Sequence, residues 1–284
     1  MRGLHDNSIS CGRPAHEIDM GGAISRSSVK KARHVIWCDT EGGVRGVNLW
    51  DITCIEETSN SVRVQRFCSV SDATKRGRAR LRQDLPALVY RDSTRSKSTC
   101  VARHELRDGA WTALDHTNVA IPLKTLLVSY LESRAGCVLV AWNMRGHDRH
   151  VLTRAVGEET LDKLALWDAL AWFRSVYRLP KNTMSSNKAG TPRALFNVPV
   201  HGNAHSSFSD AAHMRDVVMR AAYCIRREGK VDTSAYKSST RSEQFESACA
   251  EIEKCIAVDE WHDVVDRPWA EGTIPKAIYS APDA

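Results

Sequence analysis

The segment 137–142, CVLVAW, limits the possible folds of this 284-residue chain more than any other stretch. It is a nearly continuous apolar run, which is typical of a strand whose two faces are both buried. Such a strand lies in a sheet that helices cover on both sides. The run therefore predicts an interior strand of an α/β protein, parallel to the first strand of the chain.

The patterns around this run support a mixed α/β sheet flanked by helices. The segments 35–37, 47–55 and 61–70 are apolar or β-branched runs that predict three neighbouring antiparallel strands. Beyond residue 120, helical and strand-like patterns alternate, as expected for an α/β protein. We expect helices over residues 121–135, 169–177 and 206–227, a helix that begins near residue 146, and a short strand at 164–166.

Composition divides the chain into one central domain and two extensions. Residues 1–32 are rich in Gly, Ser and charge without apolar periodicity, which predicts a flexible N-terminal arm. The central domain is expected over residues 33–228. Residues 229–284 carry six Lys or Arg against eleven Asp or Glu, and this acidic C-terminal extension is expected to contain a helix over 242–256.

A basic segment interrupts the central domain. Residues 75–107 contain ten Lys or Arg and three Asp or Glu, so their net charge of +7 exceeds the +6 of the whole chain. We expect residues 71–108 to form an insertion that is mostly loop, with a short helix around 77–89. Basic clusters attract polyphosphates, so the segment indicates nucleic acid as a partner; a solvated basic loop is the alternative.

The composition, with 42% hydrophobic and 26% charged residues, is that of an ordinary globular protein. No run approaches the ~18 apolar residues of a membrane span, and the first residues contain no apolar signal core. The nine cysteines are odd in number, scattered and never in a Cys-x-x-Cys pair, which predicts reduced thiols. We therefore expect a soluble intracellular protein, in the cytoplasm or nucleus, that has no membrane partner.

The segment 34–43, HVIWCDTEGG, carries the first candidate site. Its apolar residues predict a buried strand that delivers Asp39 and Glu41 at its C-terminal end, before a Gly-Gly break. Residues two apart on a strand share a face, and two carboxylates on one face repel each other unless a cation or a proton lies between them. The pattern indicates a metal site, and a solvated strand end is the alternative.

Two later segments add further candidate ligands. In 139–152, LVAWNMRGHDRHVL, the expected strand is followed by Asp148 at the start of a helix. In 201–212, HGNAHSSFSDAA, His205 and Asp210 lie five residues apart at the entry to the long helix. Each carboxylate follows or opens a regular element, and such side chains can converge outside the carboxyl edge of a sheet.

In these three segments the chain resembles the DEDDh exonucleases, the DnaQ-like family of 3′-to-5′ nucleases in the ribonuclease H-like superfamily. Motif one, an apolar strand followed by Asp-x-Glu, matches residues 35–41. Motif two, a strand, an Asn and then an Asp that opens a helix, matches 139–152, and motif three, His-x-x-x-x-Asp-Ala, matches 205–211. The resemblance covers roughly residues 33–227 and includes WDALAWFR, residues 167–174.

The resemblance implies a ribonuclease H-like fold with a mixed five-stranded sheet. Three details depart from the family pattern. Trp142 stands where the family usually has His, and the interval from Asn143 to Asp148 is one residue longer than in the commonest form. Ser206 and Ser207 replace a more usual small apolar residue. None of these departures removes a ligand.

Phosphodiester hydrolysis gives a physical reason for this set of residues. The reaction needs a deprotonated water and relief of charge on the leaving oxygen, and two Mg²⁺ ions about 4 Å apart can supply both. Four carboxylates with few nitrogen ligands favour Mg²⁺ or Mn²⁺ over Zn²⁺. The expected metal ligands are Asp39, which bridges the ions, with Glu41, Asp148 and Asp210. His205 is the expected general base, because an imidazole of ordinary pKa accepts a proton near neutral pH.

Substrate contacts are expected beside these ligands. Backbone at Thr40, Gly42 and Gly43 lies where it could approach the terminal sugar. Trp142 could pack on the last nucleotide and Asn143 could hydrogen-bond to it, although core packing is an equal alternative for the tryptophan. Asp168, which precedes a predicted helix, is expected to cap that helix or support a ligand rather than bind a metal itself.

These observations predict a metal-dependent 3′-to-5′ exonuclease that acts on single-stranded DNA or RNA and releases nucleoside 5′-monophosphates. The first alternative is a catalytically silent nucleic-acid-binding or assembly protein that keeps an exonuclease-like fold. The second is a metal phosphodiesterase that acts on a small nucleotide, which the basic segment disfavours.

Overall fold

A single mixed sheet forms the centre of the computed structural model, which describes residues 34–42, 48–85, 101–114, 122–177, 192–193, 196–202, 205–228 and 235–257. The strands in these ranges are β1 (Val35–Glu41), β2 (Asp51–Glu57), β3 (Val62–Ser69), β4 (Val101–Arg107), β5 (Ala110–Ala113), β6 (Val138–Ala141) and β7 (Ala165–Asp168). Their order is β5-β4-β3-β2-β1-β6-β7. The pairs β1–β6 and β6–β7 are parallel, and the other neighbours are antiparallel. The predicted mixed α/β sheet is confirmed.

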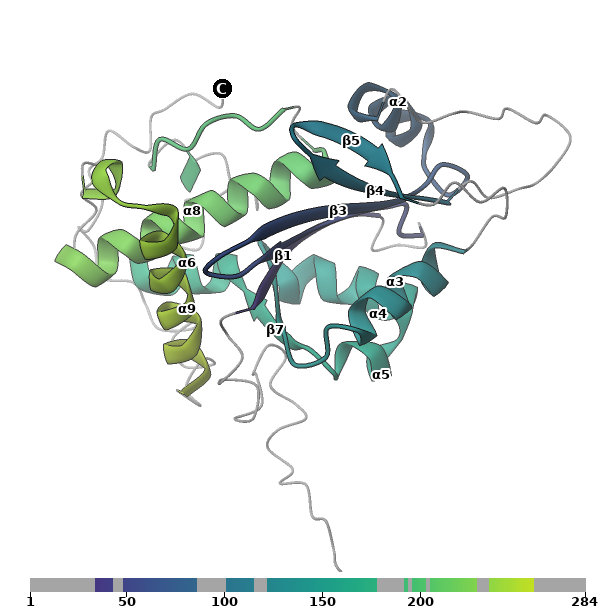
Figure 1. The fold of residues 1–284 in the computed structure, drawn as a ribbon. Helices are drawn as coiled ribbons and strands as arrows, with labels where there is room; N and C mark the ends of the chain where they lie inside the picture. Colours follow the sequence, from purple (N-terminus) through teal and green to yellow (C-terminus); the bar gives the residue numbers. More distant parts are fainter. Residues whose placement is uncertain are drawn as a thin grey trace, which may run out of the picture.

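Helices cover both faces of the sheet (Figure 1). They are α2 (Lys75–Asp84), α3 (Leu123–Glu132), α4 (Arg149–Val156), α5 (Glu158–Leu161), α6 (Ala169–Tyr177), α8 (Ser207–Glu228) and α9 (Arg241–Ala257), with a π-helical turn η1 (Met144–Asp148) and a 3₁₀ turn η2 (Ala235–Ser238). Because side chains alternate along a strand, Val35 and Trp37 of β1 pack with α6, α8 and α9, whereas Ile36 and Cys38 pack with α3, α4 and α5. No helix in the described ranges has the length and apolar character needed to cross a membrane.

The predicted interior strand is β6. Its four residues are completely buried, and it lies between β1 and β7 with parallel pairing on both sides. Its side chains join both apolar layers, Val138 and Val140 on the α8 side and Leu139 and Ala141 on the α4 side. The apolar run therefore has its expected place in the fold.

The expected number of strands is wrong, because the sheet has seven strands and not five. The two extra strands, β4 and β5, form a hairpin that pairs with β3. The first of them lies in the segment expected to be mostly loop. Polar pairs hold it there: Arg103 donates to Gln65 Oε1 (2.9 Å), and Glu105 pairs with Arg63 and Arg107. A strand joined by charged side chains lacks the apolar alternation by which strands are predicted.

The C-terminal helix α9 belongs to the same core as the sheet. Phe245, Cys249 and Ile252, at the helical spacing of residues 242–256, are buried in the layer formed by α8 and β1. Arg241 at its start donates from Nε to Glu57 Oε1 (2.9 Å) on β2. The expected N-terminal arm, residues 1–32, and the chain beyond residue 257 lie outside the described residues.

A buried arginine joins two helices to the sheet. Arg66 on β3 donates from Nε and Nη2 to the two carboxylate oxygens of Asp51 on β2, at 2.9 and 2.7 Å, and both residues are at most 1% exposed. Its Nη1 donates to Asp84 Oδ2 at the end of α2 (3.0 Å). Ser206 donates to the same Asp84 oxygen, and Ser207 donates to Asp51 Oδ2 (2.9 Å). One guanidinium therefore positions α2 and the start of α8.

We predict that Arg66→Met lowers the free energy of unfolding by about 3 to 5 kcal/mol, because it leaves a buried carboxylate without its partner. The matched control is Arg63→Met on the same strand, whose side chain is 47% exposed and pairs with Glu105. Glu105 keeps Arg107 as a partner in this control, so the expected loss is under about 1 kcal/mol. Urea unfolding of both variants measures the difference, and equal losses would contradict the role of Arg66.

Candidate metal centre

Strand β1 carries two acidic residues on one face. Asp39 and Glu41 continue the alternation of Val35 and Trp37, so they lie on the side of the sheet that α8 covers. The strand runs on to Glu41, so both carboxylates lie on its last residues rather than in the loop after it. Alternation along the strand is therefore what brings them together.

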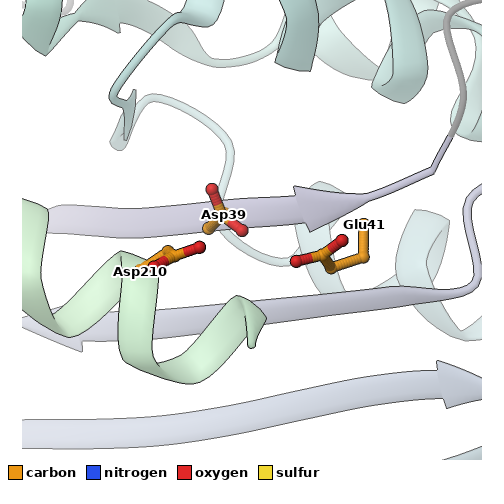
Figure 2. Close-up of side chains that lie close together, drawn as sticks. All are labelled: Asp39, Glu41 and Asp210. Atoms are coloured by element: carbon orange, nitrogen blue, oxygen red, sulfur yellow. The ribbon is translucent and has the colours of Figure 1, made fainter. Parts of the chain in front are cut away.

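Helix α8 brings a third carboxylate to this point. Asp210 lies in its first turn, and carboxylate oxygens of Asp39, Glu41 and Asp210 all lie within 4.8 Å of one another. Figure 2 shows the three groups directed toward each other, two from the strand and one from the helix. All three residues are partly exposed, so solvent and ions have access to the cluster.

Two serines locate the start of α8. The Ser207 hydroxyl lies 2.7 Å from Thr53 Oγ1 and donates to Asp51, while Ser206 donates to Asp84. These are the positions at which small apolar residues were expected from the family pattern. These contacts were not predicted from the sequence. The only sign of them in the sequence is that serine stands at both positions in place of a small apolar residue.

The electrostatics of the cluster favour protons or a cation. Burial raises the pKa of Asp39 well above its ordinary value, and the charges of Asp148, Asp210 and Glu41 raise it further. Burial, with the charges of Asp51 and Asp210, raises the pKa of Glu41 to about 8. Burial also raises the pKa of Asp210 to about 6, although a hydrogen bond from the His205 backbone lowers it.

The donor set fits a hard divalent cation. The three carboxylates offer only oxygen atoms, which Mg²⁺ and Mn²⁺ prefer, whereas structural Zn²⁺ sites are built mainly from sulfur and nitrogen. A cation at this point would stabilise the charged form of the three carboxylates, which burial disfavours, and would offset the repulsion that neighbouring carboxylates add at Asp39 and Glu41. Asp39, Glu41 and Asp210 are therefore the residues that could hold a metal ion.

The fourth predicted ligand, Asp148, lies beside this cluster but is not part of it. It is 3% exposed, and its Oδ1 accepts a hydrogen bond from Thr40 Oγ1 (2.7 Å). The Thr40 backbone also bonds this carboxylate, so Asp148 lies against β1 beside Asp39. The negative charge of Asp148 still has the largest effect of any neighbouring charge on the pKa of Asp39.

The longer interval between Asn143 and Asp148 forms a wide turn. The Asn143 carbonyl accepts from His147 N (2.9 Å) and Asp148 N (3.4 Å), which gives the π-helical turn η1. A π turn accommodates one extra residue at the start of a helix. A Cβ at Gly146 would lie 2.6 Å from Asn143 Oδ1, so a larger residue there would require the Asn143 side chain to shift.

Asp168 has the capping role that was predicted for it. Its Oδ1 accepts from the Ala171 backbone (3.0 Å), which caps α6, and its Oδ2 accepts from the Arg145 backbone (2.9 Å) in η1. The carboxylate therefore ties the turn that carries Asp148 to the start of α6. It acts as a support, and its two oxygens are used within the protein.

The predicted general base, His205, lies at the entry to α8. Its side chain is exposed and its backbone adopts a left-handed φ of 61°. Its carbonyl oxygen accepts from Arg80 Nη1 of α2 (3.1 Å). Arg80, which belongs to the basic segment 75–107, also lowers the pKa of Glu41 and Asp210 through its charge.

The predicted substrate contacts differ in their surroundings. Trp142 is 7% exposed and packs with Phe173 at a centroid distance of 5.8 Å, so the core-packing alternative describes its position. A Cβ at Gly42 would lie 3.2 Å from both Leu49 Cα and a Val151 methyl, so packing restricts this position to a small residue. Asn143 is partly exposed. Gly43 lies outside the described residues.

A scan against protein-family models found no match, and searches of curated proteins and of solved structures found no similar protein.

The raised pKa values predict how stability depends on pH. Between the ordinary and the raised pKa values the folded protein binds more protons than the unfolded chain, so without metal its stability falls as pH rises from about 5 to about 8. Protons compete with the cation at low pH. Saturating Mn²⁺ should therefore raise the melting temperature more at about pH 8 than at about pH 5.5.

Differential scanning fluorimetry with chelator and with Mn²⁺ measures both effects. The control is Asp162→Asn, an exposed residue just after α5 that should leave both curves unchanged. A Mn²⁺ effect as large at low pH as at high pH would argue against a carboxylate site with raised pKa values.

Proposed function

We propose that this protein is a metal-dependent 3′-to-5′ exonuclease of single-stranded nucleic acid, with a ribonuclease H-like domain similar to the DEDDh exonucleases. The observation that carries the proposal is the convergence of Asp39, Glu41 and Asp210 within 4.8 Å, on the strand and helix where motifs one and three lie. The position of Asp148 beside Asp39 supports it, since the resemblance requires a fourth carboxylate there.

The sheet supports the fold assignment. Without the edge hairpin β4–β5, the strands β3-β2-β1-β6-β7 remain, three antiparallel and two added in parallel. Five strands are the number that the resemblance implies. The three motif segments lie on β1, on β6 with η1, and on α8, whose acidic residues gather at the carboxyl end of β1.

The acidic residues would act through the ions they hold. When bound, Mg²⁺ or Mn²⁺ would offset the negative charge of the phosphodiester and of the leaving oxygen and make water a stronger nucleophile. Asp39, whose pKa is raised by burial and by the charges of Asp148, Asp210 and Glu41, would be the ligand common to the whole set. Without a cation these carboxylates would repel a phosphate, so substrate binding is expected to require the metal.

His205 is suited to accept the proton of the attacking water. Its side chain is exposed at the start of α8, five residues before Asp210. Attack on phosphorus would break the bond to the 3′ oxygen of the preceding nucleotide. The products are a nucleoside 5′-monophosphate and a strand shortened by one nucleotide with a 3′ hydroxyl.

We expect purified protein to shorten 5′-labelled single-stranded DNA or RNA from the 3′ end with Mg²⁺ or Mn²⁺ and not with chelator. Asp39→Asn should reduce the rate by at least about a thousandfold, since it removes a ligand charge without changing side-chain size. Asp162→Asn is the control that keeps the ladder. Intact oligonucleotide with wild-type protein under every metal condition, with binding retained, would support the catalytically silent alternative.

We expect His205→Ala to lower the rate constant of cleavage by about a hundredfold or more, because general base catalysis contributes about 10² to 10⁴. Binding of the same oligonucleotide in Ca²⁺ should change little, since the imidazole acts on water. Single-turnover kinetics and fluorescence anisotropy separate the two quantities. Equal losses of cleavage and binding would assign His205 to substrate binding instead.

A further inference from the structure

Helix α2 is a strongly basic helix next to the acidic cluster. It carries five cationic residues, Lys75, Arg76, Arg78, Arg80 and Arg82, and one acidic residue. That acidic residue, Asp84, accepts hydrogen bonds from Arg66 and Ser206, which lie between α2 and the rest of the protein. The helix therefore has no carboxylate of its own left to balance its outer surface.

The packing of α2 sets the direction in which these charges point. Thr74 caps the helix by accepting from Gly77 N (3.0 Å). Gly77 lies against the ring of Trp50, where a Cβ would come within 2.9 Å of the indole. Leu81 and Leu85 are buried in the same small apolar cluster. The side of the helix with Gly77 and Leu81 is thus held against the protein, and the other side faces solvent.

Arg80 is the residue of α2 that reaches the cluster. Its Nη1 donates to the His205 carbonyl, and its charge lowers the pKa of both Glu41 and Asp210. Among the described residues no carboxylate lies within ion-pair distance of it. A cation that is close to the site but not paired with its carboxylates is available for an anion that enters the site.

Arg76 lies one helical turn before Arg80. Residues four apart share a helix face and lie about 6 Å apart along the axis. Arg76 is exposed, and Arg80 is partly exposed. The two residues therefore form a short cationic row that starts at the cluster and leads away from it along α2.

We propose that this row binds the phosphate backbone of a single-stranded nucleic acid upstream of the bond to be cut. Arg80 contacts the phosphate nearest the cluster, and Arg76 contacts a phosphate further along the strand. The inference rests on the proposed function for its substrate and adds the path that the strand follows. Because phosphates are the same at every nucleotide, these contacts hold the strand without selecting its sequence.

The test measures binding without cleavage. Fluorescence anisotropy with 5′-labelled oligo-dT and oligo-U, in Ca²⁺ and at several salt concentrations, is recorded for wild type, Arg76→Gln, Arg80→Gln and the double variant. Arg80→Lys keeps the charge and should retain most of the affinity. The matched control is Arg226→Gln, an exposed arginine on α8 that lies 16 residues, or about 24 Å, from Asp210.

Each Arg→Gln variant should weaken binding about threefold to tenfold on both oligonucleotides. It should also lower the slope of log affinity against log salt by about 0.7, since one counterion-releasing contact to a single strand is lost. The Mn²⁺-dependent rise in melting temperature should persist, which shows that the fold and the acidic cluster are intact. Affinity and salt slope equal to those of Arg226→Gln would overturn the proposal.

The two proposals can fail separately. If the wild type degrades oligonucleotides while the α2 variants bind like the control, the strand follows another path and the nuclease assignment stands. If the α2 variants lose binding while the wild type cleaves nothing, the binding row is supported and the nuclease assignment is wrong.

Discussion

The buried guanidinium of Arg66 lies between Asp51 on β2 and Asp84 on α2, and the geometry of the candidate site depends on it. Burial alone would lower its pKa, but the charge and hydrogen bonds of Asp51 raise it, so the group stays charged. The same two carboxylates also accept hydrogen bonds from Ser206 and Ser207, the residues that open α8. A charge pair of this kind adds little net stability compared with apolar packing, but it specifies one arrangement of its neighbours. Here that arrangement places one helix beside the carboxyl end of β1.

The fold therefore holds three acidic side chains close to one another at the end of β1. Burial raises the pKa values of Asp39, Glu41 and Asp210, and neighbouring carboxylates raise those of Asp39 and Glu41 further. Glu57, a buried acid at the far end of β2, is paired: it accepts from Arg215 Nε of α8 at 2.6 Å. Among the residues that the structure describes, no cation is paired with the three carboxylates, and Arg80 lies beside them with its Nη1 on the His205 carbonyl. Unpaired carboxylates at the end of a rigid strand are typical of a site that takes up a cation.

Sequence patterns predicted most of the helices and strands and the three carboxylates that lie together in the structure. The predictions that were wrong have physical causes. Apolar periodicity located β6 because burial on both faces excludes polar residues from it. The same criterion missed β4, whose Glu105 and Arg103 pair across the strands instead of packing in an apolar layer. Asp148 was placed at a helix start, but nothing local indicated that Thr40 binds its carboxylate.

The sequence by itself determined what depends on local periodicity. Alternation along β1 places Asp39 and Glu41 on one face, and helical spacing gives α8 the apolar side that packs against the sheet. Only the tertiary structure decided where the start of α8 lies against β1 and which cationic residue lies beside the acidic cluster. Those choices come from hydrogen bonds and ion pairs between residues distant in sequence, such as Ser207 with Asp51 and Arg80 with the His205 carbonyl. Such contacts leave no periodic pattern in the chain, because a single polar residue at one position is enough to make them.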